Sequence, residues 1–293
     1  MSLAAAYMFG RKQGVVLQKL LDQFPNAAAA FSVKKIRNAY TGFCIRVRRA
    51  SDNTTLDIGF SGDDLDTSSL QTFCAGTDGF INTWYDQSGN AKNATQATNA
   101  NQPKIVTSGS VILKNGIPAI SSDGVNDNML ILGCESVFDP AFSAFSAFAY
   151  KVKAAEQRLY SYNNNASVGT TNAFYTFIKL NPNLSFTAIQ GNPFTGVSAL
   201  VPNSQDLQII VASHVVVENS NVNGKTDTSA ISTNAINDLS GISGEGYKFR
   251  IFSGRNGNNS NSEMLAQQFV FYDADKTANI QAIEDNITTT FNI

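Results

Sequence analysis

The stretch Trp84-Tyr85-Asp86-Gln87-Ser88-Gly89 gathers two aromatic rings, a carboxylate, an amide and a hydroxyl. An exposed aromatic face stacks on the C–H groups of a sugar ring, while carboxylate and amide groups bond its hydroxyls. The same residues also suit a turn, in which Asp86 and Ser88 bond backbone amides, Gly89 takes an unusual backbone angle, and the two rings fill a core. Both interpretations stay open. The sugar-binding interpretation predicts a carbohydrate site formed by Trp84, Asp86, Tyr160, Tyr162 and Asn164.

Carboxyl groups are sparse in the middle of the chain. Glycoside hydrolysis usually needs two of them, about 5 to 10 Å apart, one to protonate the leaving oxygen and one to attack the sugar or activate water. Within residues 157–217 the one acidic residue is Asp206. Asp86, Asp123 and Asp206 are the carboxylates that folding could bring to a shared cleft. We expect no catalytic residue, and hence binding without turnover.

The sequence offers few residues that could bind a metal or act as a catalytic histidine. The single histidine, His214, lies in the apolar run from Ile209 to Val217 and is predicted to be a buried strand residue, which disfavours a Ser/His/Asp relay or a multi-histidine metal site. Asp123, Asp127 and Asn128 could coordinate calcium through oxygens, but a turn is the favoured interpretation. We therefore expect no metal and no cofactor.

The three cysteines, Cys44, Cys74 and Cys134, are widely spaced and form no CxxC pair. This spacing excludes a zinc ribbon or a dithiol redox site. All three are expected to be reduced thiols.

The charge balance excludes one class of partner. Lys and Arg number 21 and Asp and Glu 23, a net charge of −2, so no basic surface is available for nucleic-acid phosphates. No window reaches the roughly 18 to 20 apolar residues of a membrane helix. Residues 1–9 lack the basic start of a secretory signal, so we expect synthesis in a cytoplasm with no signal peptide and no membrane partner.

Hydrophobic spacing predicts helices at both ends of the chain and strands between them. Residues 15–24 and 33–40 have helical spacing, and residues 280–291 place isoleucines on one face with Glu284 and Asp285 toward water. From residue 43 onward, short apolar runs alternate with Asn, Gly, Ser and Pro, which is typical of antiparallel β structure. We predict a mainly β chain, with an N-terminal helical extension at 1–40 and a β-sandwich domain at 41–293.

Three segments resemble known families. Residues 39–52, 73–77 and 83–96 are, in order and spacing, similar to the N-terminal half of the catalytic domain of fungal α-L-arabinofuranosidase B enzymes. Residues 116–127, Gly-Ile-Pro-Ala-Ile-Ser-Ser-Asp-Gly-Val-Asn-Asp, resemble a strand and turn of concanavalin A-like, laminin-G-type domains. Residues 269–293 resemble the way such domains close. The resemblance implies an antiparallel concanavalin A-like jelly-roll β-sandwich with N-terminal and C-terminal helices.

The resemblance also shows departures from the enzymes. The nucleophilic glutamate of the family should follow the strand predicted at 158–162, yet residues 160–167 contain no carboxylate. The adjacent cysteine pair of the family is missing from this region too. Gly79 stands where the disulfide partner of Cys74 is expected. These differences favour a non-catalytic role.

These observations together give the expected function. Because phage structural proteins leave the host by lysis and use such sandwiches, the leading hypothesis is a phage virion structural protein: a capsid decoration, head fibre or tail appendage that also binds host-surface polysaccharide. Its partners would be other virion proteins or symmetry mates, docked on the N-terminal extension in a homo-oligomer. The alternative is an arabinofuranosidase-like glycoside hydrolase.

Overall fold

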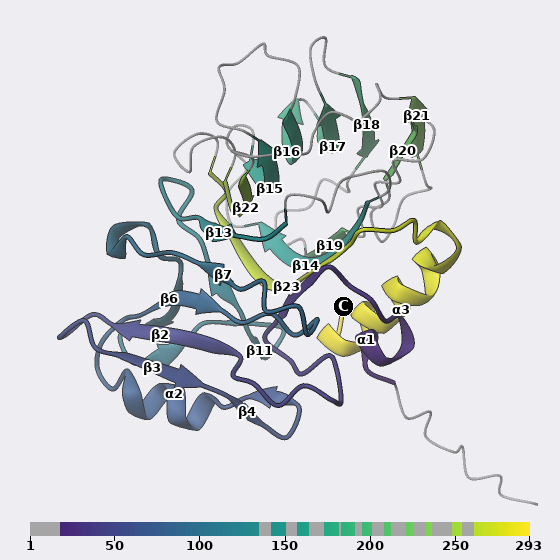
Figure 1. Cartoon of the computed structure of the whole chain (residues 1–293). Helices are drawn as coiled ribbons and strands as arrows, with labels where there is room; N and C mark the ends of the chain where they lie inside the picture. Colours follow the sequence, from purple (N-terminus) through teal and green to yellow (C-terminus); the bar gives the residue numbers. More distant parts are fainter. Residues whose placement is uncertain are drawn as a thin grey trace, which may run out of the picture.

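The computed structural model describes most of the chain (Figure 1). The described residues are 18–134, 142–150, 157–163, 173–181, 183–190, 195–200, 208–211, 221–224, 232–235, 248–253 and 261–293. His214, Asn164 and Asp206 lie outside them, so the predicted burial of His214 stays a prediction.

The first part of the chain is built from short strands and two helices. Its elements are α1 (Leu20–Gln23), β1 (Ala29–Ser32), β2 (Ile45–Arg49), β3 (Thr55–Ile58), β4 (Phe60–Ser61), β5 (Asp64–Leu65), α2 (Thr67–Phe73), β6 (Gly79–Trp84), β7 (Ala94–Thr95), the 3₁₀ turn η1 (Asn99–Asn101), β8 (Lys104–Thr107), β9 (Ser110–Val111), β10 (Leu113–Lys114), β11 (Ile117–Pro118), β12 (Ile120–Ser121) and β13 (Met129–Ile131).

Longer strands and one helix make up the second part. Its elements are β14 (Ser143–Tyr150), β15 (Gln157–Asn163), β16 (Ala173–Asn181), β17 (Asn183–Gln190), β18 (Thr195–Leu200), β19 (Gln208–Val211), β20 (Asn221–Gly224), β21 (Ser232–Ala235), β22 (Lys248–Ile251), β23 (Met264–Tyr272), the 3₁₀ turn η3 (Thr277–Asn279) and α3 (Ile280–Phe291).

The strands form a curled antiparallel sandwich, which confirms the predicted fold class. β3, β2 and β6 pair in that order, and two paths of hydrogen-bonded strands leave β6. One runs through β8, β12, β23 and β14 to β19, and the other runs through β7, β13, β22 and β15 to β16, β17 and β18. The two paths make the two layers of the sandwich.

Aromatic rings fill the space between the layers. Phe271 of β23 meets Tyr160 of β15 and Phe249 of β22 edge-to-face, with ring centroids 5.2 and 4.6 Å apart. Phe31 of β1 lies 5.9 Å from Trp84, so the N-terminal strand contributes to the same core. Each buried ring removes about 150 to 250 Å² from water, which makes this cluster the main apolar contribution to stability.

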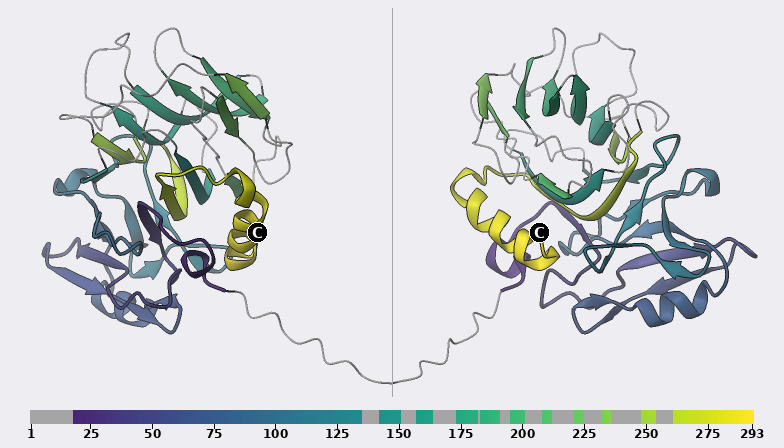
Figure 2. Two further views of the ribbon diagram at one scale, coloured as in Figure 1. Left: turned by 45° about the vertical axis from the view of Figure 1, so that its right-hand side comes forward. Right: turned by 180° about the vertical axis from the view of Figure 1, so that it is seen from behind.

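The C-terminal helix forms as predicted, with one correction. α3 lies beside α1 and packs against β14 and β19 (Figure 2). Asp275 accepts a hydrogen bond from the amide of Thr277, the first residue of the 3₁₀ turn that leads into the helix. Asp285 faces water as expected, but Glu284 is 5% exposed because its face of the helix turns toward the protein. In the described residues no helix has the length and apolar character needed to span a membrane.

The helices predicted near the N-terminus are mostly wrong. Of residues 15–24, the described part holds only the one-turn helix α1, and residues 33–40 contain no helix. The alanine-rich segment between the two predicted helices forms β1, paired with β23 from Ala29 opposite Phe271 to Ser32 opposite Gln268. Pairing with a distant strand thus overrides the local helical preference of alanine.

Candidate functional site

Asp86 is a structural residue that ties two distant segments together. Its side chain is 4% exposed. Oδ1 accepts hydrogen bonds from the amides of Ala30 and Ser88, both at 2.8 Å, and Oδ2 accepts from the Ser88 hydroxyl at 2.7 Å and the Lys92 amide at 3.0 Å. With four donors already bound, the carboxylate has little capacity left for a sugar hydroxyl.

The neighbours of Asp86 extend the same structural connection. The side-chain Nε2 of Gln87 donates to the backbone carbonyls of Ser32 and Lys34. The Gln87 Oε1 accepts from the backbone amide of Ile36 at 2.9 Å. Gly89 has a φ of +97°, and a Cβ built there would meet the Arg37 guanidinium at 2.3 Å, so the turn requires glycine. The turn interpretation of this motif is confirmed.

The predicted aromatic sugar platform needs correction for three of its rings. Trp84, Tyr160 and Tyr162 are each 0% exposed, because they belong to the aromatic core between the layers. A ring without an exposed face cannot stack on a sugar. Tyr85, which follows Trp84, is only half-buried and remains accessible.

A hollow of about 590 Å³ holds the most promising set of polar groups in the described residues. We call it the acidic hollow, because three carboxylates line it together with amides, hydroxyls, a lysine and one aromatic ring. The lining residues are Phe80, Asn99, Ala100, Gln102, Lys104, Thr107, Ser121, Asp123, Asp127 and Glu263. Carboxylates, amides and a ring edge in one concavity are the groups that recognise a sugar.

The turn after β12 positions two of these carboxylates. Asp123 Oδ1 accepts from the amides of Val125, Asn126 and Asp127 at 2.8 to 3.2 Å, and Asp127 Oδ2 accepts from the Asp123 amide at 2.9 Å. This confirms the predicted turn chemistry. Among the described residues, no group of three or more His, Cys, Asp or Glu side chains is arranged to hold a metal ion.

Glu263 reaches the acidic hollow from the other end of the chain. It immediately precedes β23, and a Cβ built on Gly124 would lie 3.0 Å from the Glu263 Cβ. Ser122 and Ser262 hold this junction together through a hydrogen bond from the Ser122 hydroxyl to the Ser262 carbonyl. Sequence reasoning missed Glu263, because only the pairing of β12 with β23 brings it to Asp123.

Two cations lie against Phe80, one of the residues that line the hollow. The Arg48 guanidinium lies 4.7 Å from the centre of the Phe80 ring and donates to Gln102 Oε1 at 2.7 Å. Lys104 lies over the same ring at 5.4 Å and pairs with Asp78 at 2.7 Å. Burial lowers the pKa of Arg48, while the hydrogen bond from Lys104 lowers the pKa of Asp78. Asp78 therefore stays ionised and cannot serve as a general acid.

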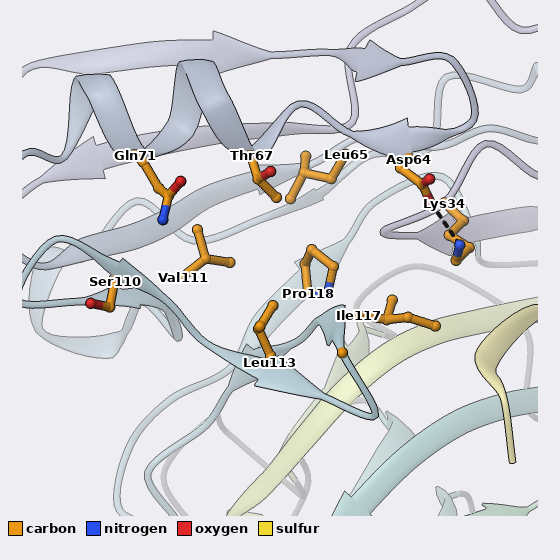
Figure 3. A pocket seen from close by; sticks show the side chains of 11 residues that line it. Lys34, Asp64, Leu65, Thr67, Gln71, Ser110, Val111, Leu113, Ile117 and Pro118 are labelled. Atoms are coloured by element: carbon orange, nitrogen blue, oxygen red, sulfur yellow. Dashed lines mark hydrogen bonds and ion pairs between the residues drawn. The ribbon is translucent and has the colours of Figure 1, made fainter.

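A second hollow, of about 580 Å³, lies between α2 and the β9–β11 region (Figure 3). Leu65, Val111 and Pro118 give it apolar walls, and Thr67 and Gln71 add polar groups from α2. Its only lining carboxylate, Asp64, forms an ion pair with Lys34 at 2.6 Å. One neutralised carboxylate does not meet the two-carboxyl requirement of glycoside hydrolysis.

The three cysteines are free and buried, as predicted. A Cβ built on Gly79 would lie 2.7 Å from Cys74 Sγ. The position where the family disulfide partner is expected therefore does lie against Cys74, and glycine leaves the thiol unpaired. Burial raises the pKa of Cys74 to about 11 and raises that of Cys44 as well.

Comparison with known proteins adds to this geometry. Residues 22–116 match the family model for the catalytic domain of α-L-arabinofuranosidase B. Over 75 residues, 25% of this chain, the sequence is 39% identical to a probable α-L-arabinofuranosidase B of Aspergillus flavus and 37% identical to an α-L-arabinofuranosidase B of Penicillium canescens. These matches cover 15% and 16% of the relatives.

Solved structures extend the likeness to nearly the whole chain. An arabinofuranosidase complexed with arabinofuranosyl-α-1,2-xylobiose superposes with a TM-score of 0.70 at 18% identity, over 94% of this chain and 65% of the solved one. A GH54 α-L-arabinofuranosidase soaked with a cyclic sulfate inhibitor gives 0.69 at 19% identity with the same coverage. The fold is similar to that of GH54 arabinofuranosidases. This chain spans 65% of the length of those solved chains.

These comparisons correct the expected virion role. The relatives that the sequence matches are fungal arabinofuranosidases, and the likeness of fold to solved arabinofuranosidases covers 94% of the chain. The hypothesis of a non-catalytic phage structural protein located in a virion is therefore wrong.

Proposed function

We propose that this chain is an arabinofuranosidase-type glycoside hydrolase, acting on α-L-arabinofuranosyl groups attached to a polysaccharide. The observation that carries the proposal is the match of residues 22–116 to the catalytic domain of α-L-arabinofuranosidase B. The likeness of fold, which extends well beyond residue 116, supports it. Fold alone would leave the chemistry open, so the proposal also needs a site with suitable groups.

The acidic hollow supplies such groups. Hydrolysis requires one carboxyl group to protonate the glycosidic oxygen as the bond to the sugar breaks, and a second to attack the anomeric carbon or deprotonate the attacking water. Glu263 and Asp127 line one concavity, and Asp123 is engaged with three turn amides. We assign the two reacting carboxyl groups to Glu263 and Asp127, with Lys104 as a hydrogen-bond donor to a sugar hydroxyl.

The direct test is turnover of 4-nitrophenyl α-L-arabinofuranoside by the full chain. We expect release of 4-nitrophenol, and release of arabinose from soluble arabinoxylan. A folded protein, verified by near-ultraviolet circular dichroism, that releases neither product at millimolar substrate would overturn the proposal.

Variants test the assignment of residues separately. Glu263→Gln and Asp127→Asn keep side-chain size and remove the ionisable group, and each is expected to lower kcat by at least about 100-fold. Asp64→Asn, in the second hollow, is the matched control and should retain turnover. Full activity of Glu263→Gln would mean that the reacting carboxyl groups lie elsewhere in the chain.

A further inference from the structure

An aromatic ring is presented to solvent at the edge of the sheet formed by β3, β2 and β6. Phe43 is 49% exposed, and its ring centroid lies 6.2 Å from that of the half-buried Tyr85. Tyr40, also half-buried, packs edge-on against Phe60 at 6.3 Å. We call the rings of Tyr40, Phe43 and Tyr85 the aromatic platform. An apolar ring as exposed as Phe43 is the feature of this cluster that points to a ligand.

The loop before β2 is shaped to hold Phe43 in place. The Tyr40 hydroxyl donates to the Phe43 carbonyl at 2.7 Å, and a Cβ on Gly42 would lie 2.5 Å from that hydroxyl oxygen. A Cβ on Gly59 would lie 3.8 Å from Phe43 Cδ1, so the ring rests over a glycine on its protein side. The ring is thus held in one orientation, which lowers the entropy cost of binding a ligand on its open side.

Fixed hydrogen-bonding groups lie beside the platform. Arg46 forms a two-pronged pair with Asp57, at 2.8 Å and 2.7 Å, and the Tyr85 hydroxyl donates to Asp57 Oδ1 at 2.6 Å. The hydrogen bond from Arg46 lowers the pKa of Asp57, so the carboxylate stays ionised. The positive charge of Arg46 and the negative charge of Asp57 then cancel. Burial, followed by the bond to Asp57, raises the pKa of Tyr85 to about 12, so its phenol stays protonated.

We propose that the aromatic platform is an accessory site for a neutral polysaccharide, bound through the backbone sugars of the glycan rather than through the arabinofuranosyl group. A half-exposed phenylalanine offers about 100 Å² of ring surface, which matches one sugar ring and is far below the roughly 800 Å² per partner of a stable protein interface. The local charge neutrality disfavours an anionic or cationic ligand. The inference rests on the proposed function for its substrate class.

Strand β2 begins two residues after Phe43 and connects the platform with the acidic hollow. Arg46 reaches Asp57 beside the platform, and Arg48 lies over Phe80 and bonds Gln102 at the hollow. A glycan that enters the hollow with a side group can therefore continue along β2 and stack on Phe43.

The test is retardation of the full chain in native gels that contain debranched xylan or linear arabinan, which carry neutral backbones. We expect Phe43→Ala to weaken the affinity about two- to tenfold, as for the loss of one aromatic contact, and Phe43→Trp to retain it. Leu132→Ala is the matched control, since Leu132 is 61% exposed and lies outside the platform. It should leave the affinity unchanged.

Two kinds of result overturn the inference. Retardation by neither glycan, or equal retardation of the wild type and Phe43→Ala, would remove the platform as a site. Self-association in sedimentation that Phe43→Ala abolishes would identify an interface between copies instead. Because binding is read without turnover, Phe43-dependent retardation of a chain that releases no 4-nitrophenol would support the platform while refuting the proposed hydrolase activity.

Discussion

Replacement of Asp86 should destabilise the protein far more than replacement of an exposed carboxylate. Asp86→Ala removes an acceptor that serves three backbone amides and one hydroxyl. The Ala30 amide is fully buried in β1, so it loses its partner without gaining water. Ser88 and Lys92 are partly exposed and can bind water in its place.

The magnitude follows from these four bonds. An unsatisfied buried donor costs about 1 to 3 kcal/mol, and the three more exposed bonds about 1 kcal/mol each, so Asp86→Ala should cost about 4 to 6 kcal/mol. That is a large part of the roughly 5 to 15 kcal/mol that stabilises a typical domain. Asp86→Asn keeps one acceptor oxygen and should cost less than Asp86→Ala.

Urea unfolding followed by tryptophan fluorescence measures the effect, since Trp84 lies in the core next to the loop. Asp285→Asn is the control: Asp285 is exposed on α3 and accepts a side-chain bond from Gln281. Its free energy of unfolding should stay within about 0.5 kcal/mol of the wild type. An Asp86→Ala protein that loses less than 1 kcal/mol, by the ~1 to 3 kcal/mol rule for buried donors, would refute the structural role given to this carboxylate.

Three further predictions concern stability and reactivity. Because Lys104 lowers the pKa of Asp78 in the folded state, the stabilisation is present above the ordinary aspartate pKa of about 3.9 and is lost as the pH falls below it; Asp78→Asn should flatten the acid limb of a stability–pH profile. The thiols of Cys44 and Cys74 should react with Ellman's reagent at pH 8 only after unfolding, since both are buried, and a disulfide between them in mass spectra would contradict this. Gly79→Ala should cost about 1 to 3 kcal/mol in urea unfolding, because its Cβ would press on Cys74 Sγ, and Cys74→Ala in the same chain should recover part of the loss.

Local sequence signals predicted the elements whose burial pattern is regular. In β2, buried Ile45 and Val47 alternate with arginines, and in α3 the spacing of Ile283 and Ile287 marks the buried face. Such patterns depend only on the period of the element. They failed at β1, whose run of alanines has helical propensity and becomes a strand only because β23 lies beside it.

The residues of the candidate site could not be predicted from any short stretch of sequence, because their burial and proximity depend on contacts between distant segments. From the sequence alone, Trp84 and Tyr160 could lie on the surface or in the core. They are buried because the two layers of the sandwich pack over them. Glu263 joins Asp123 through the pairing of strands far apart in sequence. Phe43 was noticed only as the start of a strand, because its exposure depends on the small residues packed beneath it.

The position of β1 has a consequence for how the protein is made. Among the described residues β1 pairs with β23 alone, so its backbone groups have no strand partner until residues 264–272 leave the ribosome. Before then, the attachments described for this segment include the Asp86 loop, the hydrogen bond from the Cys44 thiol to the Ser32 carbonyl and the ring contact between Phe31 and Trp84. Contacts this distant in sequence form slowly, so the final closure is expected to follow the synthesis of β23, and a truncation before residue 264 should yield an aggregating chain with an unpaired β edge.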